Sequence, residues 1–179
     1  MATHFEVHGE VAWFDDRTRR VLDDSNVLVT REAQATDWLL GLRYLTETET
    51  TWIAEYYRNG TGYTPDEMRR FYELARTTPT TPALAARQAG YGAAQPMRDY
   101  LYIKLSQKEP FDALYWNAGA AAIVNLHDGS ASLVPEVIYT GITDLEMRGR
   151  LALLTGGRHT DFGERPNDWR VEFRLRYFF

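Results

Sequence analysis

The sequence contains no cysteine, which excludes disulfide bonds and thiol chemistry. It also has no uninterrupted run of about 18 apolar residues, the length from which a membrane-spanning helix is inferred. Positive charge is not in excess, because 20 Lys and Arg residues stand against 25 Asp and Glu residues, with a formal net charge of −5. This balance argues against nucleic acid as a partner. The length of 179 residues predicts a single domain, 1–179.

Aromatic residues, in contrast, are abundant, with five Trp, eleven Tyr and eight Phe. The mean hydropathy is nevertheless low, at −0.44. Strands of a membrane β-barrel alternate between lipid-facing and polar residues, so their average hydropathy stays low while aromatic residues collect at the two membrane interfaces. The composition is therefore compatible with a membrane protein that has no membrane-spanning helix.

The last stretch of the chain alternates strictly between two kinds of residue. Apolar and aromatic residues occupy one set of positions, namely Trp169, Val171, Phe173, Leu175, Tyr177 and Phe179. The intervening charged residues are Arg170, Glu172, Arg174 and Arg176. A period of two places each set on its own face of a β-strand. A soluble sandwich strand would alternate similarly, but four charges and an ending without a polar residue favour a transmembrane barrel strand.

This ending resembles the C-terminal strand of Gram-negative outer-membrane proteins. In that family a terminal Phe, preceded by aromatic or apolar residues at alternate positions, is the signal for barrel assembly. The matching residues here are Phe173, Leu175, Tyr177 and Phe179. The resemblance implies location in the cell outer membrane, and as partners the assembly machinery, membrane lipid and lipopolysaccharide. The first residues lack the basic start and apolar core of a secretory signal, so we expect a mature chain or part of a longer one.

The same alternation predicts seven further strands, at 4–14, 37–45, 51–59, 100–106, 113–126, 132–140 and 145–153. The polar run 15–35 between the first two predicts a long loop. Asp128-Gly129 predicts a tight hairpin turn. Pro135 removes a ladder donor, which predicts a sheet edge or a bulge.

The segment 60–97 is the longest predicted insertion. Thr64, Pro65 and Glu67 form a helix-start pattern, so a short helix is expected near 64–76. A second short helix is expected within 82–90. Long insertions of this kind are usually functional or mobile. Whether this one folds into a pore or lies outside it is left open.

The predicted fold class is all-β, an antiparallel transmembrane β-barrel with eight strands in this chain; a soluble β-barrel or sandwich is the alternative. Long and short connections mostly alternate, as outer loops and periplasmic turns do. Aromatic residues on the lipid-facing side sort into two girdles. Those assigned to the outer end are Trp13, Trp38 and Trp169, and those assigned to the inner end include Trp52, Trp116 and Tyr139.

The opposite faces of the last three strands are rich in charge. The residues predicted to line the lumen are Glu136, Glu146, Arg148, Arg150, Arg170, Glu172, Arg174 and Arg176. We expect Glu136 near Arg148, and both Arg148 and Arg150 near Glu172. The arginines could attract anionic solutes, or they could stiffen the wall through ion pairs with the glutamates. The two roles are compatible.

Two internal segments, T-T-W-I-A-E-Y-Y-R-N-G and Y-L-Y-I-K-L-S-Q-K-E-P-F-D, together with the charged final hairpin, resemble the C-terminal half of longer proteobacterial porin-like proteins. The resemblance covers roughly 38–179. It implies an outer-membrane location and passive transport, but it gives no substrate. The predicted function is passive diffusion of small hydrophilic solutes, and the arginines of the last strands add a preference for anionic ones. Eight strands can also close a barrel filled by side chains, so a complete barrel and the C-terminal portion of a larger one both stay open. A homo-oligomer is equally open.

No catalytic set stands out, so enzymatic activity is not expected, and no cofactor or metal is predicted. His127 and Ser130 flank the predicted turn, and a lipid-modifying barrel enzyme would need a hydrogen bond between them. The pattern assigns His127 to the inward face. His4, Glu6, His8 and Glu10 share one strand face, for which a wet lumen stripe is preferred over a metal site. A structural or adhesive eight-stranded barrel is the alternative function.

Overall fold

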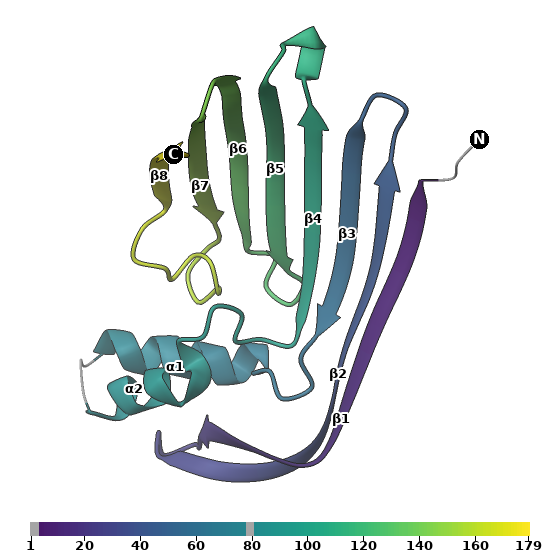
Figure 1. The fold of residues 1–179 in the computed structure, drawn as a ribbon. Coiled ribbons are helices and arrows are strands. Elements are labelled where there is room, and N and C mark those ends of the chain that lie inside the picture. The colour runs from purple at the N-terminus through teal and green to yellow at the C-terminus, as the bar shows by residue number, and fades with distance from the viewer. Residues whose placement is uncertain (1–3, 78–80) are drawn as a thin grey trace.

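The computed structural model describes residues 4–77 and 81–179. Eight strands form one antiparallel sheet in which spatial order follows chain order, which confirms the predicted all-β class and strand number. The strands are β1 (Phe5–Leu22), β2 (Leu28–Leu45), β3 (Thr50–Arg58), β4 (Asp99–Lys108), β5 (Trp116–Asn125), β6 (Ala131–Ile142), β7 (Leu145–Thr155) and β8 (Trp169–Tyr177). In the described sheet, β1 and β8 are the two edges (Figure 1).

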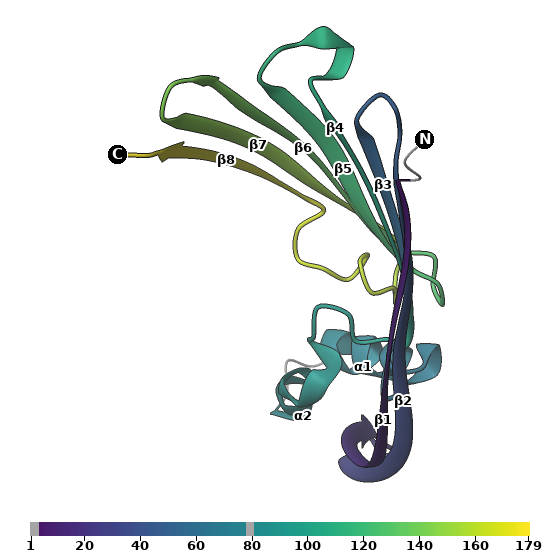
Figure 2. The same ribbon diagram turned by 45° about the vertical axis from the view of Figure 1, so that its right-hand side comes forward.

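The sheet is curved, and its two faces differ in what covers them (Figures 1 and 2). The insertion between β3 and β4 and the β7–β8 loop lie on the concave side. The convex face carries the apolar set of the alternating pattern, and many of its members are exposed: Phe5, Val7, Val11, Trp13, Leu40, Leu42, Tyr44, Trp52, Ile103, Trp116, Leu133, Val137, Leu153, Trp169, Val171, Phe173, Leu175 and Tyr177. The packed core therefore lies on one side of the sheet only.

The predicted loop at 15–35 is wrong, because this segment is a two-stranded arm. β1 and β2 stay paired up to Leu22 opposite Leu28, with a register shift between Phe14 and Arg17. The charged run D-D-R-T-R-R hides the strand because the shift interrupts the alternation. Asp23 closes the turn by accepting hydrogen bonds from the backbone N–H groups of Ser25 and Val27. The arm extends past the other strands and curls beneath the helices (Figure 2).

The insertion contains α1 (Pro65–Thr77), α2 (Thr81–Ala86) and a wider π-helical turn at Arg87–Tyr91. The expected helix start is confirmed as a capping box: the Thr64 N–H donates to the Glu67 carboxylate at 2.9 Å, and the Glu67 N–H donates to Thr64 Oγ1 at 3.3 Å. The second predicted helix, within 82–90, is present as α2, which passes directly into the π-helical turn; the helical conformation is interrupted only at Gly90, with a φ of 133°. No helix in the described part of the chain is long and apolar enough to cross a membrane.

The hydrophobic core joins the insertion to the concave face and to the arm. Its buried members include Met68, Phe71 and Tyr72 of α1, Val21 and Leu22 of the arm, and Tyr63, Tyr91, Met97, Tyr100 and Phe162. Tyr57, Ile123 and Leu154 pack against this cluster from β3, β5 and β7. These three residues belong to the concave set of the alternation, so the insertion is held on the concave side by apolar packing.

Pro135 lies inside β6, between β5 and β7, so the expectation of an edge or a bulge is wrong. It faces Ala120 of β5 in an unbroken register. On the β7 side, Leu133 pairs with Leu153 and Glu136 with Arg150, so the register does not change across Pro135. The sheet therefore accommodates the missing N–H by interrupting the ladder for two residues rather than by bulging. β5 also starts later than predicted, because Phe111, Asp112 and Tyr115 have positive φ and belong to a tight loop that ends at Trp116.

The concave face as the candidate functional site

Charged side chains of β6 and β7 form a set of ion pairs in the candidate site. Two guanidinium nitrogens of Arg150, Nε and Nη2, donate to Glu136 Oε2 at 3.1 and 2.6 Å. Arg148 lies 3.7 Å from the same carboxylate and 3.5 Å from Glu146. The expected proximity of Glu136 and Arg148 is therefore present. Arg148 lies between Glu136 and Glu146, and Arg150 is held by Glu136, so neither points freely from the sheet.

β8 contributes a second, more exposed group. Glu172 lies opposite Arg150 in the β7–β8 ladder, but its ion pairs are with its own strand neighbours, Arg174 at 3.2 Å and Arg170 at 3.7 Å. Arg176 approaches Glu146 at 3.9 Å. Together the eight charged residues comprise five arginines and three glutamates, so the face keeps a surplus of positive charge. Ion pairing and a basic surface thus coexist on these strands.

The opposite edge of the sheet has its own polar contact, which depends on a glycine. His8 of β1 reaches across β2 to Glu55 of β3, with 3.2 Å between His8 Nε2 and the carboxylate. Gly41 lies between them, and a Cβ at this position would overlap the His8 ring. Glu6, a neighbour of His8 on the same face, approaches Arg43 at 4.0 Å. Among the described residues, no group of three or more His, Asp or Glu side chains gathers as a metal site.

The insertion, whose position the sequence leaves open, lies at the end of the concave face opposite the chain termini (Figures 1 and 2). Arg19 of the arm fastens it by a bidentate contact to Glu67, at 2.8 and 3.0 Å. Burial acts to raise the pKa of Glu67, but hydrogen bonds from Thr64 and the Arg19 guanidinium outweigh it and hold this pKa below its ordinary value. Tyr91 adds a second fastening, because its hydroxyl accepts the Leu22 N–H at 3.0 Å.

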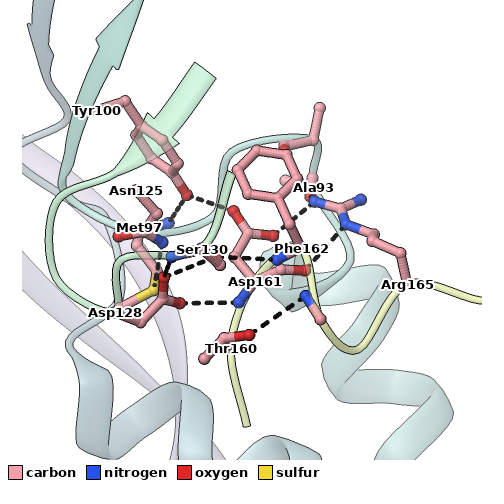
Figure 3. Close-up of polar contacts among 12 residues, drawn as sticks. Ala93, Met97, Tyr100, Asn125, Asp128, Ser130, Thr160, Asp161, Phe162 and Arg165 are labelled. Carbon is pink, nitrogen blue, oxygen red and sulfur yellow. Dashed lines mark hydrogen bonds and ion pairs between the residues drawn. The ribbon is translucent and has the colours of Figure 1, made fainter. Parts of the chain in front are cut away.

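A buried polar cluster fastens the β7–β8 loop to the sheet (Figure 3). The Asp161 carboxylate accepts the Tyr100 hydroxyl at 2.8 Å and an Arg165 nitrogen at 2.6 Å, and its side chain is 1% exposed. The Asp161 N–H donates to Asp128, at 2.8 Å. Burial raises the pKa of the Asp161 carboxyl, although the bonds from Tyr100 and Arg165 oppose this. Arg165 also donates to the Ala94 carbonyl at 2.8 Å, which joins the loop to the insertion.

His127 and Ser130 have separate partners, so the hydrogen bond that a lipid hydrolase would need is not formed. Ser130 is buried, and its hydroxyl donates to Asp128 at 2.6 Å. His127 Nε2 lies 2.7 Å from the Asp99 carboxylate, which also accepts the Tyr56 hydroxyl. Tyr56 and Asp99 belong to the convex set, so the inward assignment of His127 is wrong. The alternation does not extend to this residue because β5 ends at Asn125.

The predicted girdle residues and Phe173, Leu175 and Tyr177 of the assembly signal lie on the convex face, and Phe179 follows the end of β8. Trp116 packs against Tyr139 with ring centroids 4.7 Å apart, and Trp38 packs against Tyr56 at the same distance. Trp13, Trp52 and Trp169 are exposed, as are the four assembly-signal residues, Phe173, Leu175, Tyr177 and Phe179. Their roles as membrane anchors and as an assembly signal stay predictions.

The chain matches no protein-family model, no curated protein and no solved structure. The functional interpretation therefore depends on the geometry of the molecule itself. Three residues at the centre of that geometry escaped sequence reasoning: Asp161, Tyr100 and Arg19. Asp161 lies in an irregular loop without periodicity, and Arg19 lies in a segment interpreted as a loop. The only available signal was the capping-box Glu67, which marks where a basic partner could bind.

Proposed function

We propose that this sheet forms the wall of an outer-membrane β-barrel channel through which small hydrophilic solutes, preferentially anions, diffuse passively. The observation that carries the proposal is the exposed apolar convex face. On β8 alone, Trp169, Val171, Phe173, Leu175 and Tyr177 are each between 59% and 67% exposed. Soluble monomers rarely expose apolar patches larger than a few hundred square ångströms. A hydrocarbon environment accounts for such a face, because the transfer of each apolar side chain from water into hydrocarbon is favourable.

The concave face supports the polar half of the proposal. Its arginines outnumber its glutamates on β6–β8, and charged groups that line a pore set its ion selectivity. The insertion occupies the end of this face opposite the termini, where it would narrow the channel mouth. Both termini lie at the other end, together with the short β2–β3, β4–β5 and β6–β7 connections (Figure 1). This is the arrangement expected when short turns are periplasmic.

The proposal requires that β1 and β8 acquire partners. Backbone groups at a free strand edge cannot be left unpaired in lipid. Closure of β1 onto β8, or pairing with strands that lie outside this sheet, would satisfy them. By its likeness to the outer-membrane ending, the C-terminal signal would recruit the assembly machinery, and the girdle residues would contact lipid and lipopolysaccharide.

The test is refolding into lipid vesicles followed by single-channel recording in planar bilayers. We expect heat-modifiable mobility on gels, stepwise current and anion selectivity. Arg148→Gln combined with Arg150→Gln should reduce that selectivity, whereas Arg69→Gln, an exposed substitution on α1, should not. A water-soluble monomer would overturn the membrane assignment, and a folded barrel with no current would overturn the channel.

A structural or adhesive barrel is the second candidate, and one observation favours it. The apolar core of the insertion fills one end of the concave face, as the interior of a small closed barrel is filled by side chains. A closed eight-stranded barrel of this kind would fold in lipid without conducting. The presence or absence of current in the same recording therefore separates the two candidates.

A further inference from the structure

A cavity of about 710 Å³ lies where α1, α2 and the β7–β8 loop meet. Its volume falls within the range of about 300–1,000 Å³ that is typical of small-molecule sites. Three separate segments of the chain build it. α1 is held by the Glu67–Arg19 contact, the π-helical turn after α2 by the Leu22 N–H donated to the Tyr91 hydroxyl, and the loop by the buried Asp161 cluster. Each segment therefore has its own contact to the arm or the sheet.

One wall of the cavity is apolar. It is formed by Phe71, Ala75, Ala83 and Leu84, with Tyr72 and Tyr91 beside them. Phe71 stacks on Tyr91 with ring centroids 5.0 Å apart, and both rings belong to the hydrophobic core. Leu84, in contrast, is 58% exposed, so an apolar side chain at the rim of the cavity has no protein cover. A flat apolar ligand would cover Leu84 and contact the aromatic wall.

The same lining carries three arginines, from α1, the π-helical turn and the β7–β8 loop, and two acids that already have partners. Glu164 lies 3.4 Å from Arg76 and accepts the His159 N–H at 2.9 Å. Asp161 is held by Arg165 and Tyr100. Arg87 is exposed, and within residues 4–77 and 81–179 its guanidinium has neither a hydrogen bond nor an ion pair. The cavity therefore has one uncompensated positive charge, at Arg87.

We propose that this cavity binds a small organic monoanion whose single carboxylate pairs with Arg87 and whose flat apolar body lies against Phe71 and Leu84. A guanidinium presents a planar fork of donors that matches a carboxylate. An inorganic anion would leave the apolar wall uncovered, and a neutral apolar molecule would leave Arg87 without its partner. The location of this ligand at a channel mouth rests on the proposed function. Binding itself does not require that the protein conduct ions.

The experiment uses benzoate and benzamide as matched probes, titrated by calorimetry into the full-length chain refolded in nonionic detergent. Benzamide has the same ring without the charge, so it also corrects for partition into micelles. We expect saturable benzoate binding and about tenfold weaker benzamide binding, because a charge-assisted hydrogen bond is lost. Arg87→Gln should weaken benzoate about tenfold and leave benzamide unchanged, whereas Arg69→Gln should change neither. Equal binding of the two probes, or equal effects of the two substitutions, would overturn the proposal.

A second variant tests the apolar wall and does not depend on Arg87. Leu84 is exposed, so Leu84→Gln should leave the fold intact. We expect it to reduce the preference for benzoate over acetate by severalfold, because the ring loses its contact at the rim. An unchanged preference would contradict the proposed pose. Current recorded without benzoate decides the channel, whereas the titration decides the site, so one can fail while the other stands.

Discussion

The two faces of the sheet arise from the same alternation of residues, but their side chains have different environments. The convex face is mostly apolar, with apolar side chains exposed from β1 to β8. The concave face is divided: its β6–β8 part near the termini holds ion pairs, and the opposite end holds the core that the insertion completes. A period of two therefore decides which face a residue occupies, but not what that face packs against. The environment of each face depends on the irregular segments.

The largest expected effect comes from the packed end of the concave face. Met68 is 1% exposed at the centre of the insertion core, so Met68→Ala should cost about 2–5 kcal/mol of stability. We expect the helices to lose hydrogen-exchange protection while the strands keep theirs. Arg69→Ala, one position along, should stay within about 0.5 kcal/mol. Equal loss of protection in strands and helices would mean that the insertion and the sheet unfold as one unit.

A charge on the convex face tests the comparison directly. Leu151 belongs to the apolar set and Arg150, its neighbour, to the charged set. If the convex face meets lipid, Leu151→Arg should cost roughly 2–4 kcal/mol of folding stability in lipid vesicles. Arg150→Leu should be tolerated far better, with its main effect on the Glu136 ion pair. Equal tolerance of the two substitutions, measured by urea titration of heat-modifiable mobility, would contradict the assignment of the faces.

Gly41 tests the concave face at its other edge. A Cβ there overlaps His8, so Gly41→Val forces the His8–Glu55 contact apart. The expected cost is about 1–3 kcal/mol, as for other overpacked sites. Gly149→Val is the matched control, because its Cβ would face only Val137 at an ordinary 3.5 Å on the convex side. Comparable destabilisation by both substitutions would contradict the claim that the His8–Glu55 contact requires a glycine at position 41.

The smallest effect is a pH dependence of the insertion. The fold lowers the pKa of Glu67 below its unfolded value of about 4.3, so the associated stability is present above that pH. It is lost as the pH falls through the lower, folded value and the carboxylate is protonated. We expect α1 to lose about 1 kcal/mol of protection over this range, and Glu67→Gln to remove the pH dependence. A wild-type profile that is unchanged by this substitution would exclude Arg19–Glu67 as its source.

The strands could be predicted from the sequence because apolar and polar residues alternate along them. Every predicted strand is present, and the capping box at Thr64 locates α1 to within one residue. The arm at 15–35 could not be predicted, because the register shift after Phe14 interrupts the alternation within a charged run. Pro135 does not mark an edge or a bulge, because a central strand can lack one N–H donor without a change of register.

The candidate site was predictable only where it lies on strands. Glu136, Arg148 and Arg150 follow from alternation and hairpin register. Asp161 and Arg87 do not, because their positions depend on how an irregular loop and a π-helical turn pack against elements distant in sequence. Long-range packing of this kind leaves no local pattern in the chain.

The arm also has a kinetic consequence. Val21 and Leu22, from the first strand, share one core with Phe162, from the loop before the last strand. These contacts join segments about as far apart as the sequence allows, and such closures are slow because chain entropy is lost before packing compensates for it. The helices can form early, but their core stays incomplete until both ends of the sheet have arrived. The insertion is therefore the part of the molecule whose protection should appear last during folding.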